Sequence, residues 1–241
     1  MCFCSCDLWV MNNTLQHQKI IVAGASSGIG LASARLLTAE GASVTVTGRN
    51  PTKLAATGLP SAVVDSRRRE DLDTFFSGIG AFDHLVVALG SARGLGPFAQ
   101  MALSDLREGF EEKYWAALHT VQAALPFVSG SVTLLTAITA TGRIPGTSGI
   151  GAYNGALEIM VPIWARELAP VRFNAVSPGV IDTPWWDFLP PADRQAAFDQ
   201  YATQIPLGRV GKAEDVAEVV GFLVKAAYVT GRVVVCDGGM S

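Results

Sequence analysis

The fold of this chain is decided by the stretch Ala23-Gly24-Ala25-Ser26-Ser27-Gly28-Ile29-Gly30. An apolar run over residues 20–23 precedes the glycines, and a helical pattern over 31–39 follows them. Glycine lets the backbone turn sharply and lets a pyrophosphate approach it, while the helix N-terminus offers free N–H groups and a positive dipole end. Strand, glycine turn and helix in this order predict a dinucleotide-binding loop. The alternative is a glycine-rich turn in some other α/β protein.

The same alternation of short apolar runs and helical patterns continues along the chain. A repeated strand–helix order predicts right-handed crossovers. We therefore expect a Rossmann-like, doubly wound α/β fold, with a parallel sheet of about seven strands and helices on both faces. The predicted strands are 19–23, 43–47, 61–64, 84–88, 131–136, 171–176 and 232–236, and the predicted helices are 29–39, 69–76, 103–125, 152–168 and 213–225.

Length and composition limit the classes of protein that the chain can belong to. Its 241 residues suit a single α/β domain. Hydrophobic residues make up 49% of the chain, but charged residues and prolines interrupt each apolar run, so we expect no membrane span. The net charge is −3 and no basic stripe occurs, which argues against nucleic acid as a partner.

Three of the four cysteines, Cys2, Cys4 and Cys6, lie in the first six residues, and Cys236 stands alone near the end. This spacing is no disulfide framework, so it indicates a reducing compartment, the cytoplasm. No further cysteine or histidine cluster completes a metal site, and we predict none. Residues 1–18 are interpreted as an N-terminal leader or tail, and residues 19–241 as one dinucleotide-binding domain.

One long stretch, residues 177–210, shows no regular pattern. It holds the aromatic residues Trp185, Trp186 and Phe188. Loops of this length in compact domains are usually functional, so residues 185–210 are predicted to form a lid over an apolar substrate. The aromatic residues are equally compatible with lid packing or with a contact between subunits.

Further motifs occur at the expected places between these elements. Ala152-Tyr153-Asn154 opens a predicted helix, and Asn174 to Pro184 reads Asn-Ala-Val-Ser-Pro-Gly-Val-Ile-Asp-Thr-Pro. The C-terminal part contains Pro206-Leu207-Gly208-Arg209, Glu214-Asp215-Val216-Ala217, Thr230-Gly231 and Asp237-Gly238-Gly239. Together with Gly24-x-x-x-Gly28-Ile29-Gly30, these stretches resemble the short-chain dehydrogenase/reductase family over about residues 18–241.

The choice of cofactor depends on Arg49, which follows the second predicted strand. Folds that prefer NAD place an acidic residue there, whereas an arginine accommodates a 2′-phosphate through charge-assisted bonds. Arg49 therefore favours NADP(H), with NAD(H) as the other candidate; the alternative is a solvated loop arginine. The predicted cofactor contacts, most of them implied by the resemblance, are Gly24, Ser26, Ser27, Gly28, Ile29, Gly30, Arg49, Asp65, Ser66, Ala88, Gly90, Pro178, Gly179, Ile181 and Thr183.

The catalytic residues depart from the pattern that the resemblance implies. The family uses a serine, a tyrosine and a lysine with a supporting asparagine. Tyr153 stands at the tyrosine position, but Leu157 occupies the lysine position one turn later. The serine position falls on Ala140, so the neighbouring Thr139 and Thr141 become the candidates, with Thr136 more distant. For Tyr153, the alternative is a packed helix tyrosine.

The resemblance places the supporting asparagine at Lys113. Our hypothesis is that the missing cation has been relocated, so that Lys113 reaches into the space left by Leu157, near Tyr153. A cation about 5 Å from a phenolate lowers the tyrosine pKa by about two units at an effective dielectric constant near 20. The alternative is a surface lysine that pairs with Glu111 or Glu112.

The sequence thus predicts an NADP(H)-dependent oxidoreductase that transfers hydride between nicotinamide and a small-molecule carbonyl or alcohol. In this prediction Tyr153 is the acid/base that carries the proton, Lys113 gives electrostatic support, and a threonine replaces the serine. The alternative is a catalytically silent nucleotide-binding protein that acts as a sensor or assembly module. The family's helices at 103–125 and 152–168 usually meet between subunits, and small and apolar residues suit that packing here, so we expect a homodimer or homotetramer. These residues are Ala116, Ala117, Ala156, Ile159 and Ile163.

Overall fold

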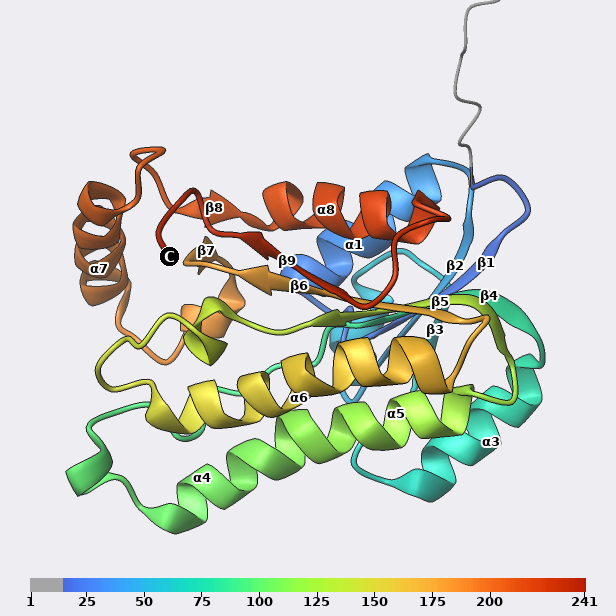
Figure 1. The fold of residues 1–241 in the computed structure, drawn as a ribbon, viewed down its shortest axis with the longest axis horizontal. Helices are drawn as coiled ribbons and strands as arrows, with labels where there is room; N and C mark the ends of the chain where they lie inside the picture. The colour runs from blue at the N-terminus through green and yellow to red at the C-terminus, as the bar shows by residue number, and fades with distance from the viewer. Residues whose placement is uncertain (1–14) are drawn as a thin grey trace, which may run out of the picture.

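The computed structural model describes residues 15–241 and contains the predicted doubly wound sheet (Figure 1). All seven strands are parallel, in the order β3-β2-β1-β4-β5-β6-β9, and this order reverses direction between β1 and β4. The predicted fold class is confirmed. The strands are β1 (Lys19–Ala23), β2 (Ser43–Gly48), β3 (Ser61–Val63), β4 (Phe82–Val87), β5 (Val128–Leu135), β6 (Arg172–Pro178) and β9 (Arg232–Cys236).

Helices cover both faces of this sheet (Figure 1). α1 (Gly28–Ala39) and α8 (Ala213–Lys225) pack together on one face, while α3 (Arg69–Ile79), α5 (Ala116–Ala124) and α6 (Ser148–Glu167) cover the other. Strand β1 shows why two layers form. Ile20 and Val22 point into the core on the α1 side, and Ile21 points into the core on the α5 side. Side chains alternate along a strand, so a strand buried on both faces is apolar throughout.

The helix predicted over residues 103–125 is interrupted. It consists of α4 (Leu103–Gly109), a π-helical turn (Phe110–Trp115) and α5. The wider turn carries Lys113, which is 6% exposed. π-Helical turns inside helices occur frequently at functional sites, because the extra residue redirects side chains. The interruption therefore places a charged residue where a regular amphipathic helix would bury an apolar one.

The stretch 177–210 contains regular structure that the sequence analysis did not predict. It forms β7 (Ile181–Asp182), which pairs with β8 (Gly211–Lys212), a 3₁₀ turn (Pro184–Trp186) and α7 (Pro191–Gln204). Pro191 occupies the first turn of α7, where a missing N–H does no harm. The short α2 (Pro51–Ala55) was also missed, although Asn50 caps it.

Residues 1–14 lie outside the described residues, and the three N-terminal cysteines lie among them. The predicted boundary at residue 18 differs from the structure. Leu15 is buried in the core, and the side chain of Gln18 bonds to His84, so both belong to the domain. None of the helices within residues 15–241 combines the length and the apolar character that crossing a bilayer requires.

Candidate active site

A cavity of about 710 Å³ opens at the carboxyl ends of β1, β4, β5 and β6. Open α/β sheets bind ligands at this edge, where the strand order reverses. The glycine turn lines this cavity, and so do Lys113, Tyr153 and Asn154. Every predicted cofactor contact lines it: Gly24, Ser26, Ser27, Gly28, Ile29, Gly30, Arg49, Asp65, Ser66, Ala88, Gly90, Pro178, Gly179, Ile181 and Thr183.

The glycine turn is packed so closely that larger residues do not fit. Gly24 has a φ of 80°, and a Cβ there would lie 2.6 Å from the carbonyl oxygen of Ala88. A Cβ on Gly30 would lie 2.5 Å from the oxygen of Gly24. Helix α1 starts at Gly28, so its free N–H groups face the cavity wall. This cradle fits a dinucleotide pyrophosphate.

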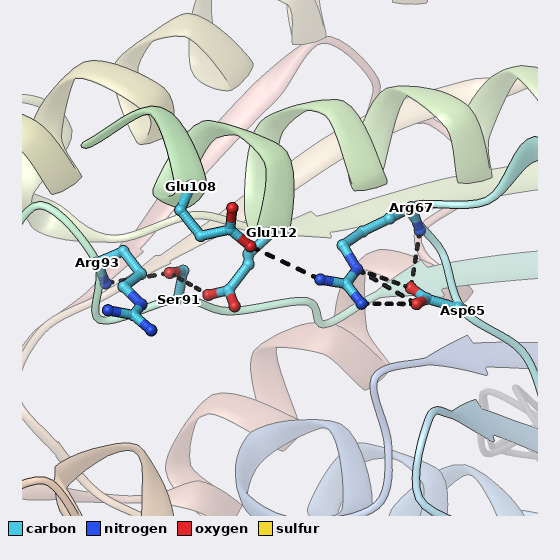
Figure 2. Close-up of polar contacts among 6 residues, drawn as sticks. All are labelled: Asp65, Arg67, Ser91, Arg93, Glu108 and Glu112. Carbon is cyan, nitrogen blue, oxygen red and sulfur yellow. Dashed lines mark hydrogen bonds and ion pairs between the residues drawn. The ribbon is translucent and has the colours of Figure 1, made fainter. Parts of the chain in front are cut away.

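Arg49 and Asp65 lie at the same end of the cavity. Arg49 is exposed and forms no ion pair with residues 15–241, although its charge is close enough to lower the pKa of Asp65. The larger cause of that lowered pKa is a hydrogen bond from the guanidinium of Arg67, which lies 2.8 Å from the carboxylate (Figure 2). Arg49 is thus free to bind an anion, whereas Asp65 already holds a cation.

Polar side chains connect α4 and the π-helical turn to the loops after β3 and β4 (Figure 2). Arg67 lies 3.7 Å from Glu108. The hydroxyl of Ser91 donates to Glu112 at 2.7 Å and accepts from the backbone N–H of Arg93 at 3.1 Å. These contacts fix the loop that forms the floor of the cavity beside Gly90.

Tyr153 does not point its hydroxyl toward a cation. The hydroxyl donates to the carbonyl oxygen of Ser91 at 2.9 Å and lies 3.3 Å from that of Arg93. The ring is 1% exposed and meets Phe110 edge to face. Burial raises the pKa of Tyr153 above its ordinary value of 10.0. The expectation that a neighbouring cation lowers this pKa is therefore wrong.

Lys113 points inward, so the alternative of a surface lysine is also wrong. Its ammonium donates to the carbonyl oxygen of Leu135, at the end of β5, at 2.8 Å. Burial lowers the pKa of Lys113 to about 8, and the negative charge of Glu158 partly opposes that shift. Leu157 leaves no space for this ammonium, because it is packed into the apolar core.

The cavity residue on α6 that sequence reasoning missed is Asn154. Its amide nitrogen donates to the carbonyl of Ile150 at 2.8 Å and lies 3.4 Å from the hydroxyl of Thr139. Its amide oxygen is buried and has no partner within residues 15–241. Thr139 lines the cavity beside it, whereas Thr141 is exposed and does not line it. A signal was available, because Asn154 directly follows Tyr153 in the recognised motif.

Glu158 was also missed. One oxygen of its carboxylate accepts bonds from the hydroxyls of Thr136 at 2.7 Å and Ser177 at 2.8 Å. Thr136 and Ser177 are buried at the ends of β5 and β6. These bonds orient the carboxylate next to the strand end that holds Lys113.

An aromatic cluster borders the cavity, where Trp185 and Trp186 line its wall. The N–H of Trp185 donates to the carbonyl of Ser91 at 3.1 Å, and that of Trp186 donates to Ile181 at 3.0 Å. Phe188 packs against both tryptophans, and Phe198 of α7 packs against Trp186. The segment is therefore fastened to both walls of the cavity.

A doubly wound sheet with a glycine turn at its switch point defines the class of dinucleotide-binding α/β proteins. Residues 24–241 match the family described as Enoyl-(Acyl carrier protein) reductase. Relatives of known sequence and structure extend this match. The chain belongs to the short-chain dehydrogenase/reductase family.

Two curated relatives are similar to nearly the whole chain. A 3-oxoacyl-[acyl-carrier-protein] reductase of Thermotoga maritima is 32% identical, over 94% of this chain and 98% of the relative. A putative ketoacyl reductase of the granaticin polyketide synthase of Streptomyces violaceoruber is 34% identical, over 91% of this chain and 94% of the relative. The crystal structure of a small-chain dehydrogenase in complex with NADPH has a TM-score of 0.84 at 29% identity, over 93% of this chain and 99% of that one.

Proposed function

We propose that this protein is an NADP(H)-dependent oxidoreductase that transfers hydride between nicotinamide and a carbonyl or alcohol. One observation carries the proposal. A single cavity joins a complete dinucleotide cradle to a buried lysine and an unpartnered amide oxygen. The relatives support it, since two are named as reductases of oxoacyl or ketoacyl groups and a similar structure holds NADPH.

In this proposal the cofactor binds in the cavity at the carboxyl ends of the strands. The N–H groups at the start of α1 hold the pyrophosphate, and Arg49 binds the 2′-phosphate that distinguishes NADP from NAD. Ser66 and the segment from Pro178 to Thr183 line the adenine and nicotinamide ends. When bound, the reduced nicotinamide supplies a hydride, and the chain supplies orientation, exclusion of water and a proton.

The substrate proposed is a small or medium carbonyl compound with an apolar part. Residues 185–210 are proposed as its lid, because Trp185, Trp186 and Phe188 give that end an aromatic wall. A 3-oxoacyl thioester is one candidate, suggested by the names of the relatives. Aldehydes, ketones and quinones are the others.

The test has two parts. NADPH and NADH are titrated by fluorescence, and NADPH consumption is then followed with each substrate class. We expect NADPH to bind more tightly than NADH, and Arg49→Ala to weaken NADPH binding about tenfold with little effect on NADH. Failure of wild-type protein to bind NADPH would overturn the proposal.

A second function, that of a catalytically silent NADP(H)-binding module, is favoured by one observation. The hydroxyl of Tyr153 is bonded to two backbone carbonyls instead of facing a cation. NADPH binding with no turnover in any substrate class would support this alternative.

We also propose that two or four copies associate through α5 and α6. The support is the exposure of large apolar residues on α6 and on the π-helical turn that leads into α5: Trp115 of that turn is 44% exposed, and Ile159 and Ile163 of α6 are 69% and 47% exposed. The cytoplasm is the proposed location, supported by the free thiol of Cys236, which suits a reducing compartment.

A further inference from the structure

We propose that Lys113 is the group that transfers the proton to and from the reacting oxygen, with Asn154 accepting a hydrogen bond from the substrate hydroxyl and Glu158 positioning the lysine. This inference rests on the proposed oxidoreductase function. It departs from the sequence hypothesis, in which Tyr153 carries the proton and Lys113 only adjusts its pKa.

Lys113 is placed to bind an oxygen atom of a ligand. The residue lines the cavity, and its ammonium is held at the end of β5, between β4 and β6. An ammonium has three N–H donors. One is bonded to the oxygen of Leu135, and the other two have no acceptor within the described part of the chain. A buried ammonium with unused donors beside a cavity is able to bind an oxygen atom of a ligand.

Asn154 has a buried hydrogen-bond acceptor that faces no donor within the described residues. Its amide oxygen is buried and unpartnered, although its amide nitrogen is fully engaged. A buried acceptor without a donor destabilises a protein, so such an atom in a cavity wall indicates a missing hydrogen-bond donor. Asn154 and Lys113 both line the cavity, and α6, which carries Asn154, packs against the π-helical turn that carries Lys113. A hydroxyl located there satisfies both, because it accepts from the ammonium and donates to the amide.

Tyr153 is excluded from the proton transfer by its own contacts. Its hydroxyl donates to the carbonyl of Ser91, which also accepts from Trp185. The ring is 1% exposed and packs edge to face on Phe110, which holds the hydroxyl in these contacts. Tyr153 therefore fastens the loop after β4 to α6, which is a structural role.

Glu158 is the positioning residue. Its carboxylate is held by Thr136 and Ser177 and stabilises the charged form of Lys113 from α6. Other titratable groups on the elements packed against the π-helical turn are not among the causes of the lowered pKa of Lys113: Asp105, Arg107 and Glu108 on α4, His119 on α5, and Tyr153, Arg166 and Glu167 on α6. Among these groups only Glu158 raises the pKa of Lys113 against the lowering caused by burial.

The chemistry balances in the direction of reduction. The reduced nicotinamide supplies a hydride, with two electrons, to the carbonyl carbon, and the π pair of the C=O bond moves to the oxygen. An N–H bond of Lys113 breaks, and its proton passes to that oxygen, which leaves a neutral amine and an alcohol. Water returns a proton to the amine. A lysine whose pKa burial has lowered to about 8 is suited to this role near neutral pH.

The decisive experiment compares four variants in NADPH-dependent reduction by the intact protein. Lys113→Met should reduce kcat at least about a hundredfold while NADPH affinity changes less than about threefold. Tyr153→Phe should lose less than about tenfold. Lys19→Met, which alters an exposed lysine outside the cavity, is the matched control. Wild-type kcat should fall as pH rises through about 8, and Glu158→Gln should move that fall to lower pH.

A second readout does not require turnover. The Nζ signals of the lysines are titrated by NMR, and one lysine should titrate near pH 8 in wild-type protein and be missing in Lys113→Met. Wild-type turnover that survives Lys113→Met but is lost in Tyr153→Phe would overturn this inference and leave the proposed function intact. Bound NADPH without turnover of any substrate would overturn both.

Discussion

A buried ammonium makes Lys113 costly for stability, whatever its role. Its pKa is about 8 in the folded protein, against an ordinary value of 10.5 for a lysine in water. The folded state therefore binds fewer protons than the unfolded state between these two values, and stability rises with pH there. Below pH 8 the buried charge destabilises the folded state by its full amount. This destabilisation disappears as pH rises from 8 to 10.5.

This linkage makes a prediction for Lys113→Met, which removes the titrating group. The variant's stability relative to wild type should decline by about 2–3 kcal/mol between pH 7 and pH 10, because only wild type gains stability over that range. Urea unfolding at the two pH values measures it. If the two proteins differ in free energy of unfolding by the same amount at both pH values, Lys113 does not have a lowered pKa in the folded protein.

His84 should make the protein sensitive to acid. Its ring bonds to Ser131 and Gln18, and burial, with the charge of Arg172, lowers its pKa to about 4 from 6.5. The stabilisation that the neutral His84 ring gives to the folded state is complete above pH 6.5. It is lost as pH falls toward 4, because the ring is then protonated. From pH 7 to pH 5 we expect a loss of about 2 kcal/mol in the free energy of unfolding.

The control for this prediction is His84→Gln, which has no titrating ring. The variant should be less stable at pH 7 and should lose less stability between pH 7 and pH 5 than wild type does. Equal pH dependence of the two proteins, measured by denaturant unfolding, would show that His84 is not the responsible group.

Prediction from sequence succeeded for residues whose role is local. No Cβ fits at Gly24 or Gly30, because the carbonyl oxygens of Ala88 and Gly24 lie too close, and every residue predicted to contact the cofactor lines one cavity. Prediction from sequence could not show the contacts of Tyr153, because the acceptors of its hydroxyl lie in a loop about sixty residues earlier. It also missed Asn154, whose unpartnered oxygen is evident only once the surrounding wall is built.

At the scale of elements, strong periodicity gave accurate boundaries and weak periodicity did not. β1, β9 and α8 begin and end where the sequence predicted. The π-helical turn within residues 103–125 was not predicted, because one extra residue per turn barely changes the apolar pattern. α7 was missed because only Phe198 of its residues is buried, so it lacks an apolar face.

The end of α8 depends on one residue of β6. The guanidinium of Arg172 donates to the carbonyls of Leu223 at 2.9 Å, Val224 at 2.7 Å and Val229 at 3.1 Å. The last carbonyls of a helix have no partners within it, and charged donors satisfy them well. Arg172→Met should reduce the free energy of unfolding by about 2–3 kcal/mol, as measured by denaturant unfolding.

Hydrogen exchange locates the effect of that substitution. Amides in the last turn of α8 and in the loop to β9 should exchange faster in Arg172→Met than in wild type, while those of β1 should change only with global stability. Arg172→Lys, which keeps the charge and fewer donors, should be intermediate. A variant as stable as wild type would show that water replaces the guanidinium at no cost.

At the scale of the whole molecule, the alternation of strands and helices was sufficient to predict the layers and the parallel sheet. The residues predicted to contact the cofactor line one cavity, because that cavity is built from the strand ends that this topology aligns. The rest of the cavity wall was not predictable. It is assembled from segments near residues 90, 113, 136, 154 and 185, and only tertiary packing decides which of their side chains face the cavity.

The outer face of α5 and α6 makes the last prediction, which concerns assembly. Both helices cover the same face of the sheet (Figure 1), and α6 packs against the π-helical turn that leads into α5. Ile159 and Ile163, one turn apart on α6, are exposed, and so is Trp115 of that turn. Exposed apolar surface marks interaction sites where it is large enough. Light scattering should give the mass of a dimer or tetramer, and Ile159→Glu with Ile163→Glu should lower it, since two carboxylates cannot be buried in an apolar interface. Val63→Glu, at the exposed edge strand β3, should leave the mass unchanged. A monomeric wild-type protein at micromolar concentration would mean that this face has no second copy to cover it.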